Sequence, residues 1–224
     1  MDGRNLRQEL VQAARMLFSS GVMQASGHGN MSARLAGERM LLTRGGGLNE
    51  VTVEDFAEVG FDGDVGAAGL PPGTREIVGM HACVYRERPH VGAVIHTHSP
   101  HVTSFAIANQ PLPSAYEAML RWGVTDAVPV AAWAPRGSAE SVSNIVDQIR
   151  AHPDVPAVLL GNHGILAFGP DPVATARIVI ILEEAAQMTL GARRLGGERP
   201  FPPGALEKER AHMERFGSVL GRPG

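Results

Sequence analysis

Hydrophobic positions along the chain follow two spacings, one typical of helices and one typical of strands. Residues 4–20 place apolar side chains on one helical face and predict an amphipathic first helix. Residues 59–69 predict a strand and a hairpin turn through Asp62 and Gly63. Other short apolar runs predict strands at 31–34, 40–43, 91–96, 127–132, 155–160 and 165–168. Further helices are predicted at 74–88, 101–109, 138–152, 171–195 and 207–216.

Local signals support several of these helices. Thr74 and Ser138 can each cap a helix N-terminus, and Pro172 suits the first turn of the longest helix. Strands mixed with helices of moderate length predict a layered α/β fold. The sequence shows neither an internal repeat nor a low-complexity linker, so residues 1–224 are expected to form a single domain.

The composition narrows the classes of function. The formal net charge is -3 and no stripe of lysine and arginine is present, which argues against a nucleic-acid partner. No run reaches the roughly 18 apolar residues that a membrane helix needs, so no membrane association is expected. The one cysteine, Cys83, allows no internal disulfide. We therefore expect a cytoplasmic protein that acts on a small molecule.

A pair of histidines, His96 and His98, directly follows an apolar strand. Residues two apart on a strand face the same way, so both imidazoles can point at one metal ion. The alternative is a chance pair, since the chain contains nine histidines. His163 strengthens the metal interpretation because it lies in a tight Gly-Asn-His-Gly turn at the end of another apolar strand. On its own, His163 could equally be a turn residue that bonds to backbone.

Three histidines with an open fourth position are typical of catalytic zinc sites. We therefore predict one divalent metal per subunit, zinc first, with manganese, cobalt or iron as alternatives. Glu76, near the start of the preceding helix, could complete the metal shell or serve as a base, or simply favour the helix dipole. The loop at Gly29 and Asn30 and the Arg44 segment could bind an anion, or form an ordinary turn and an exposed arginine.

Several motifs, in a fixed order, resemble the class II aldolase/adducin family over nearly the whole chain. They are Gly29-Asn30-Met31-Ser32-Ala33-Arg34, Met40-Leu41-Leu42-Thr43, Pro72-Gly73-Thr74-Arg75-Glu76, His81-Ala82-Cys83-Val84-Tyr85, Arg88-Pro89, Ala93-Val94-Ile95-His96-Thr97-His98-Ser99-Pro100 and Leu159-Leu160-Gly161-Asn162-His163-Gly164.

The resemblance implies a three-layer α/β/α sandwich with a mixed, largely antiparallel central sheet. It implies that the three histidines hold a metal, usually zinc, that Glu76 is the family's acidic residue, and that Gly29 and Asn30 belong to a phosphate loop. It also implies a cyclic homotetramer with sites at the junctions of neighbouring subunits.

The sequence departs from the family pattern in three places. Glu76 stands five residues before His81 where the family has four, and one extra helical residue turns a side chain by about 100°. The Ser-Ser pair that helps to bind phosphate in the sugar-phosphate aldolases is Thr74-Arg75 or Gly73-Thr74 in this chain. Gly45 stands where those enzymes carry a hydroxyl. Glu117, next to Tyr116, takes the place of the family's tyrosine acid. The anion contacts are therefore assigned to Gly29, Asn30, Thr43, Arg44, Gly45, Gly46 and Thr74, for a phosphate or a carboxylate.

These features predict a metal-dependent lyase of the aldolase type, which cleaves a C–C bond of a hydroxy-carbonyl or sugar-phosphate substrate through an enediolate. Glu76 would carry the proton, and Tyr116 or Glu117, from a neighbouring subunit if need be, would handle the leaving hydroxyl. The alternatives are a decarboxylase of an oxo or aromatic acid, a sugar-phosphate epimerase and an iron-dependent oxygenase. A non-enzymatic, adducin-like module is a further alternative, and it should hold no metal.

Overall fold

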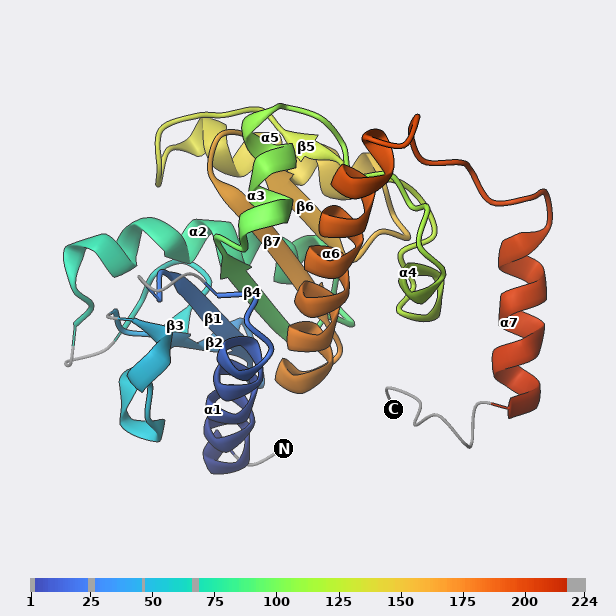
Figure 1. Ribbon diagram of the computed structural model, residues 1–224. Helices are drawn as coiled ribbons and strands as arrows, with labels where there is room; N and C mark the ends of the chain where they lie inside the picture. The colour runs from blue at the N-terminus through green and yellow to red at the C-terminus, as the bar shows by residue number, and fades with distance from the viewer. Residues whose placement is uncertain (1–2, 24–26, 46, 66–68, 217–224) are drawn as a thin grey trace.

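The computed structural model describes residues 3–23, 27–45, 47–65 and 69–216 (Figure 1). Its centre is a seven-stranded sheet with the order β3-β2-β1-β4-β7-β6-β5. Every neighbouring pair is antiparallel except β5 and β6, which are parallel. The strands are β1 (Gly29–Arg34), β2 (Arg39–Thr43), β3 (Phe56–Gly60), β4 (Ala93–Thr97), β5 (Val130–Ala131), β6 (Ala157–Leu160) and β7 (Gly164–Gly169).

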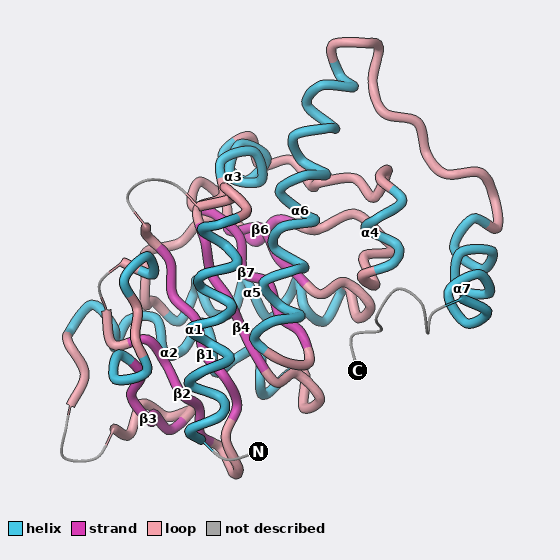
Figure 2. Tube along the Cα trace, turned by 60° about the horizontal axis from the view of Figure 1, so that its bottom comes forward, coloured by secondary structure: helices cyan, strands magenta, loops and turns pink. Residues whose placement is uncertain are grey.

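Helices cover both faces of the sheet, which confirms the predicted three-layer α/β/α sandwich (Figures 1 and 2). One layer contains α1 (Gly3–Ser19), α3 (Pro100–Ile107) and α6 (Pro172–Arg193), and the other contains α2 (Pro72–Glu87) and α5 (Ala139–Ala151). Two short 3-10 turns, Leu48–Glu50 and Val53–Asp55, lie between β2 and β3. Helix α4 (Glu117–Arg121) lies beside α6, and the charged helix α7 (Ala205–Phe216) stands apart from the sheet and meets α4 (Figure 1).

The alternation of side chains along each strand divides the core into two clusters. On β1, Met31 and Ala33 pack with the α1/α3/α6 layer. On β4, Ile95 packs on that same side while Val94 joins the α2/α5 cluster. Successive side chains on a strand point to opposite faces, so His96, two residues after Val94, faces the α2/α5 layer.

A buried carboxylate fixes the segment that follows β4. Glu183 on α6 is almost fully buried, and its two oxygens accept hydrogen bonds from the backbone N–H groups of His101 and Val102, each at 2.9 Å. The first turn of a helix offers these N–H groups no partner within the helix, and the helix dipole favours a negative charge there. Glu183 thereby holds the start of α3, and with it the end of β4, against the helix layer.

Most of the predicted elements are confirmed, with shifted ends. Ser138 caps α5, since its side chain accepts from Ser141 N at 3.1 Å, and Asp171 caps α6 in front of Pro172. Thr74 was wrongly predicted as a cap: α2 begins at Pro72, and the Thr74 hydroxyl instead donates to Arg44 O. No helix of the described segments is long and apolar enough to cross a membrane.

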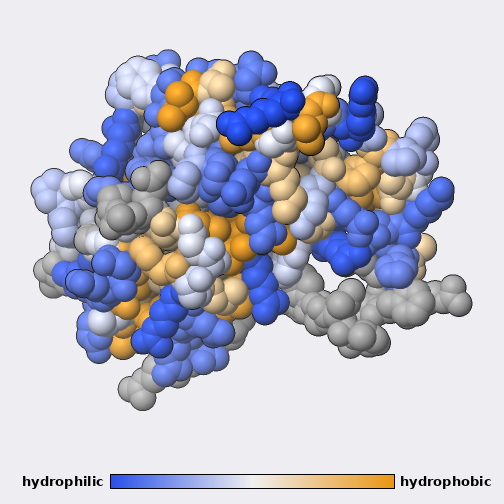
Figure 3. All heavy atoms as spheres, in the orientation of Figure 1, coloured by the Kyte–Doolittle hydropathy of each residue, from blue (hydrophilic) through white to orange (hydrophobic). Residues whose placement is uncertain are grey.

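Two strands differ from their predicted extents. The strand expected at 59–69 begins earlier, at Phe56, because it pairs with all of β2, and no partner strand follows its turn within residues 61–65 or at 69 and 70. The strand expected at 127–132 keeps only Val130 and Ala131, since Val128 instead forms an isolated bridge with Leu112. On the face seen in Figure 3, hydrophilic side chains cover most of the surface and apolar ones show between them.

Candidate metal centre and substrate pocket

Three histidines meet at one end of the sheet. His96 lies on β4 and is buried, His98 follows the end of that strand, and His163 lies in the turn before β7. Their ring centroids are 4.6–4.9 Å apart, and each ring offers one nitrogen within 4.8 Å of the other two. This cluster could hold a metal ion, and it consists of the three histidines that the sequence predicted.

The pairing of β4 with β7 brings the three rings together. Thr97 pairs with Ile165, so the turn that carries His163 sits directly beside the end of β4. Asn162 in that turn has a φ of 57°, a left-handed conformation that asparagine tolerates. A Cβ atom on Gly164 would lie 2.4 Å from Thr97 O and 2.9 Å from His98 Cδ2. A glycine is therefore required for the turn to approach the histidines this closely.

The hydrogen bond of His96 to the backbone leaves Nε2 of the ring for a metal ion. Its Nδ1 lies 2.9 Å from Ile165 O, a carbonyl that can only accept, so Nδ1 carries the proton and Nε2 has a free lone pair. His96 Nε2 and His98 Nε2 are 3.1 Å apart. Two ligands of a tetrahedral zinc ion at ordinary Zn–N distances would be about 3.3 Å apart, so the spacing fits a shared ion.

All three imidazoles favour the neutral form that binds metal. Burial lowers the pKa of His96 well below its usual value, with a further contribution from His163 and His98. The pKa of His163 falls to about 4, chiefly through burial and then through His98 and Arg136. The pKa of His98 is also lowered, by burial first and by His28 and Arg136 next. At neutral pH these rings are therefore uncharged, so a metal ion meets no positive charge on them.

The histidines line a pocket of about 970 Å³ between α2, α5 and the loops at this end of the sheet. One wall is apolar and comprises Ile77, Met80, Val142, Ile145 and Leu160. The rest of the lining includes the N-terminal end of β1, the segment after β2 and the first turn of α2. A mixed pocket of this size fits a small polar molecule with a few fixed contacts.

Glu76 lines the pocket, although it is not part of the histidine cluster. Its carboxylate lies 3.4 Å from Arg136 Nε, and both side chains are about half exposed. Arg136 also donates to Gly73 O at 2.9 Å. The next residue, Gly137, has a φ of 75°, and a Cβ there would come within 3.0 Å of Glu76 Cβ. The loop before α5 thus packs on Glu76.

Sequence reasoning missed Arg136 and Gly137. Both stand about sixty positions after Glu76, and the packing of α2 against α5 brings them to it. The only local signal was an arginine and a glycine just before the Ser138 cap, which is a common arrangement in loops.

Six of the seven predicted anion contacts line the pocket: Gly29, Asn30, Thr43, Arg44, Gly45 and Thr74. The seventh, Gly46, lies outside the described residues. The two threonine hydroxyls already have backbone partners. Thr43 Oγ1 accepts from Met31 N at 3.2 Å, and Thr74 Oγ1 donates to Arg44 O at 2.5 Å. Among the six predicted contacts that line the pocket, Asn30 and Arg44 are thus the ones whose side chains carry N–H donors.

Residues 8–190 match the family described as "Class II Aldolase and Adducin N-terminal domain". The chain belongs to this family. A Rhodospirillum rubrum protein named 5-methylthioribulose-1-phosphate/5-deoxyribulose-1-phosphate aldolase is 26% identical over 97% of this chain and 95% of its own length. A Haemophilus influenzae protein named 3-oxo-tetronate 4-phosphate decarboxylase is 28% identical over 81% of this chain and 85% of its own.

A solved structure shows the same fold. The structure of an L-fuculose 1-phosphate aldolase has a TM-score of 0.80 to this class II aldolase domain, with 26% identity, and the match covers 95% of this chain and 96% of that one. The comparison agrees with the three-layer sandwich and the mixed sheet described above. It identifies enzymes among the relatives and leaves the substrate of this family member open.

Two predicted catalytic residues of this class II aldolase domain lie away from the pocket of their own chain. Tyr116 precedes α4 and packs against the apolar cluster of the α1/α3/α6 layer. Glu117 begins α4 and forms an ion pair with Arg121, which also binds Glu209 of α7. Neither residue is among those that line the pocket of its own chain.

The close approach of Gly164 generates a test of the histidine geometry. We expect Gly164→Ala to weaken Zn²⁺ binding by about 10- to 100-fold, because the added methyl displaces the rings of His98 and His96. Competition with a chromophoric chelator measures this affinity. Gly191→Ala on α6 is the control, since nothing lies within 4 Å of its Cβ position. Equal zinc affinity in Gly164→Ala and the wild type would contradict the geometry.

Proposed function

We propose that this protein is a metal-dependent lyase of the aldolase type, which cleaves a C–C bond of a small phosphorylated hydroxy-carbonyl compound. The observation that carries the proposal is the convergence of three neutral imidazoles on one point of a pocket that also holds a carboxylate. His96, His98 and His163 would hold the ion, with zinc as the first candidate and manganese, cobalt or iron as alternatives. The bound ion would supply Lewis acidity for the charge that develops on the substrate oxygens.

Glu76 is proposed as the group that transfers the proton. A base first removes the proton of a substrate hydroxyl, and the C–C bond then breaks. The electron pair of that bond remains on the other fragment as an enediolate, which takes up a proton at carbon. Glu76 is the carboxylate that lines the pocket, and its ion pair with Arg136 favours one orientation of the side chain. The packing of Gly137 against it limits the space into which it could turn away.

The polar end of the pocket would hold the anionic end of the substrate. Of the residues assigned to the anion, Asn30 and Arg44 carry side-chain N–H donors, and Gly45 offers backbone there. The names of the curated relatives reported above all refer to phosphorylated compounds, which supports a phosphate ester over a free carboxylate. The donor groups suit a phosphate, since each of its oxygens accepts hydrogen bonds.

A decarboxylase is the second candidate, and the relative from Haemophilus influenzae favours it. Loss of carbon dioxide from an oxo acid leaves the same kind of electron pair next to a carbonyl, so the same residues would serve. The two activities are separated by product. A panel of ketose 1-phosphates and phosphorylated oxo acids should yield either a triose phosphate with an aldehyde, or carbon dioxide. A metal-loaded protein that produces neither from any member of the panel contradicts both proposals.

We also propose a homotetramer in which a neighbouring copy contributes Tyr116 or Glu117 to each site. Its support is the resemblance to the family and the position of both residues outside the pocket of their own chain. Exposed apolar side chains at Ile107 on α3, Met188 on α6 and Leu195 just after α6 would suit a surface that a neighbouring copy covers. Light scattering should return four times the 23.7 kDa chain mass, and a fully active monomer would contradict the proposal.

Glu76→Gln separates metal binding from proton transfer. We expect the variant to keep the metal and its unfolding temperature, because Glu76 is half exposed and outside the histidine cluster. Turnover should fall by about 10²- to 10⁴-fold, which is the usual contribution of a positioned acid–base group. Metal analysis and steady-state kinetics measure the two effects.

Glu87→Gln is the matched control for this variant. Glu87 lies on the same helix and is also paired with an arginine, Arg150, at 2.8 Å, but it is not part of the pocket. Glu87→Gln should therefore keep wild-type turnover. Wild-type turnover in Glu76→Gln would instead assign the proton to another group, such as Glu117 of a neighbouring copy or a water molecule.

A further inference from the structure

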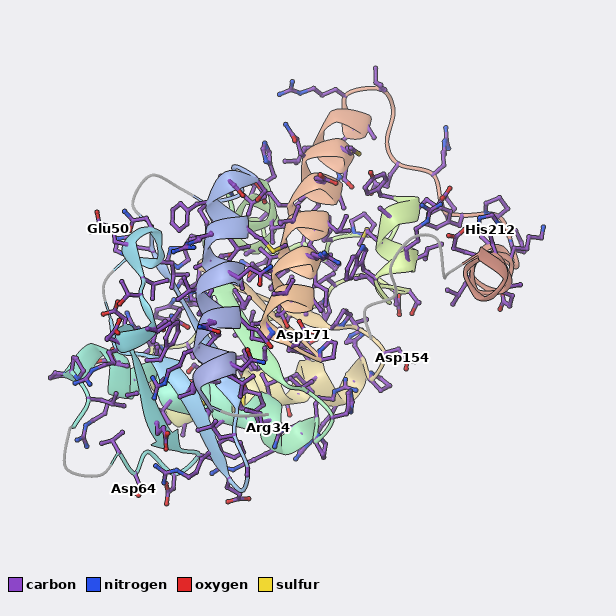
Figure 4. The ribbon with its side chains drawn as sticks, turned by 90° about the horizontal axis from the view of Figure 1, so that it is seen from below. Arg34, Glu50, Asp64, Asp154, Asp171 and His212 are labelled. Carbon is purple, nitrogen blue, oxygen red and sulfur yellow. The ribbon has the colours of Figure 1, made fainter. Side chains whose placement is uncertain are left out.

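A column of polar side chains runs between β1 and α2, inside an otherwise apolar layer. Asn30, Ser32 and Arg34 occupy alternate positions on β1 and therefore face the same layer. His81 and Tyr85 lie one turn apart on α2 and meet them. The column leads from the pocket, at Asn30, to the other end of β1, where Arg34 is labelled in Figure 4.

Short hydrogen bonds join the members of this column. Ser32 Oγ lies 2.7 Å from Tyr85 Oη and 2.7 Å from His81 Nδ1. His81 Nε2 lies 2.6 Å from Asn30 Oδ1. Ser32 and His81 are fully buried and Tyr85 nearly so, whereas Asn30 is partly exposed to the pocket. Arg34 holds the far end, since it donates to Tyr85 O and its guanidinium lies 4.7 Å from the centre of the Tyr85 ring.

The chemistry of the atoms fixes the direction of each bond. The amide oxygen of Asn30 can only accept, so His81 Nε2 must carry the proton that it shares with Asn30. Burial lowers the pKa of His81 to about 3, so the ring is neutral and its Nδ1 accepts. The Ser32 hydroxyl then donates to His81 Nδ1 and accepts from the Tyr85 hydroxyl.

This direction determines what Asn30 offers to the pocket. Because its oxygen is bonded to His81, its amide nitrogen, with two N–H donors, is the end left for a ligand. Asn30 pairs with His96 across β1 and β4, so it lies next to the histidine cluster. The two threonine hydroxyls of the same region are engaged with backbone atoms. Of the residues assigned to the anion, only Asn30 and Arg44 carry side-chain N–H donors, so the orientation of the Asn30 amide decides one of these two contributions.

We propose that His81 is a positioning residue for substrate binding: through its bond to Asn30 it keeps the amide nitrogen of that residue turned toward the anionic group of the substrate. The proposal rests on the proposed function for the identity of the anion, a phosphate ester. Without the imidazole, the Asn30 amide is free to turn its oxygen toward the anion, which repels it. A neutral His81 places no charge of its own beside the metal ligands.

The alternative is a core histidine that only satisfies its own hydrogen bonds, and binding of inorganic phosphate to the metal-loaded protein separates the two roles. We expect His81→Met and Asn30→Ala each to weaken phosphate binding about tenfold, the usual effect of losing a bond to a charged group. The double variant should lose no more than either single one, because both changes remove the same contact. His81→Gln restores a donor and an acceptor and should bind within about threefold of the wild type.

In the phosphate-binding experiment the proposal is overturned by wild-type phosphate affinity in His81→Met, by losses that multiply in the double variant, or by no phosphate binding to the wild type. Metal content and unfolding temperature are measured on every variant, and His81→Met counts only where both match the wild type. If it does not fold, the ¹⁵N spectrum of histidines in the wild type provides the test. A His81 ring protonated at Nε2 supports the proposal, and protonation at Nδ1 overturns it.

Phosphate binding does not require turnover, so the test is independent of the proposed reaction. If His81→Met weakens phosphate binding but the wild type cleaves no sugar phosphate, the lyase proposal is contradicted and the role of His81 is retained. Where a substrate is cleaved, His81→Met should raise KM for the phosphorylated substrate about tenfold while kcat changes less than threefold, as expected when only uniform binding is lost. A fall in kcat alone would overturn the positioning role.

Discussion

The antiparallel pairing of β4 with β7 is the constraint on which the site depends. It places the end of one buried strand beside the tight turn that begins the next, and so brings His96 and His98 to His163. The approach is close enough that Gly164 has no room for a side chain. Glu183 accepts hydrogen bonds from the first turn of the following helix and so anchors the segment that continues from β4. The backbone therefore places the three histidines beside one another.

The two faces of the sheet contribute differently to this arrangement. The α1/α3/α6 layer packs Met31, Ala33 and Ile95 of β1 and β4 in an apolar cluster and holds the strands in register. The α2/α5 layer carries the chemistry, because the histidine cluster, Glu76 and the polar column of His81 all lie on that side. Burial has the same consequence for His96 and His81, since it keeps both rings neutral. The neutral His96 ring can thus bind a metal ion, and the neutral His81 ring orients the Asn30 amide.

The histidine pair could be predicted from the sequence because residues two apart on a strand face the same way, whereas His163 was added from its place after another apolar strand and from the family motifs. His96 and His98 are two apart at the end of a strand, and His163 lies in the short turn Gly161-Asn162-His163-Gly164. The contacts around Glu76 could not, because Arg136 and Gly137 reach it only through the packing of α2 on α5. The hydroxyls of Thr43 and Thr74 were assigned to an anion, but both bond to backbone, which a motif cannot reveal. Helix α4 was missed because five residues are too few to show a helical period.

X-ray absorption at the metal edge of the purified protein tests the central claim most directly, because it reports the atoms around the ion without a known substrate. The account predicts about one metal per chain with imidazole scattering from three histidines, and nitrogen at about 2.0–2.1 Å if the ion is zinc. An additional oxygen ligand would mark the open position. A sulfur ligand, fewer than three imidazoles, or a protein that takes up no metal when zinc is supplied would contradict it.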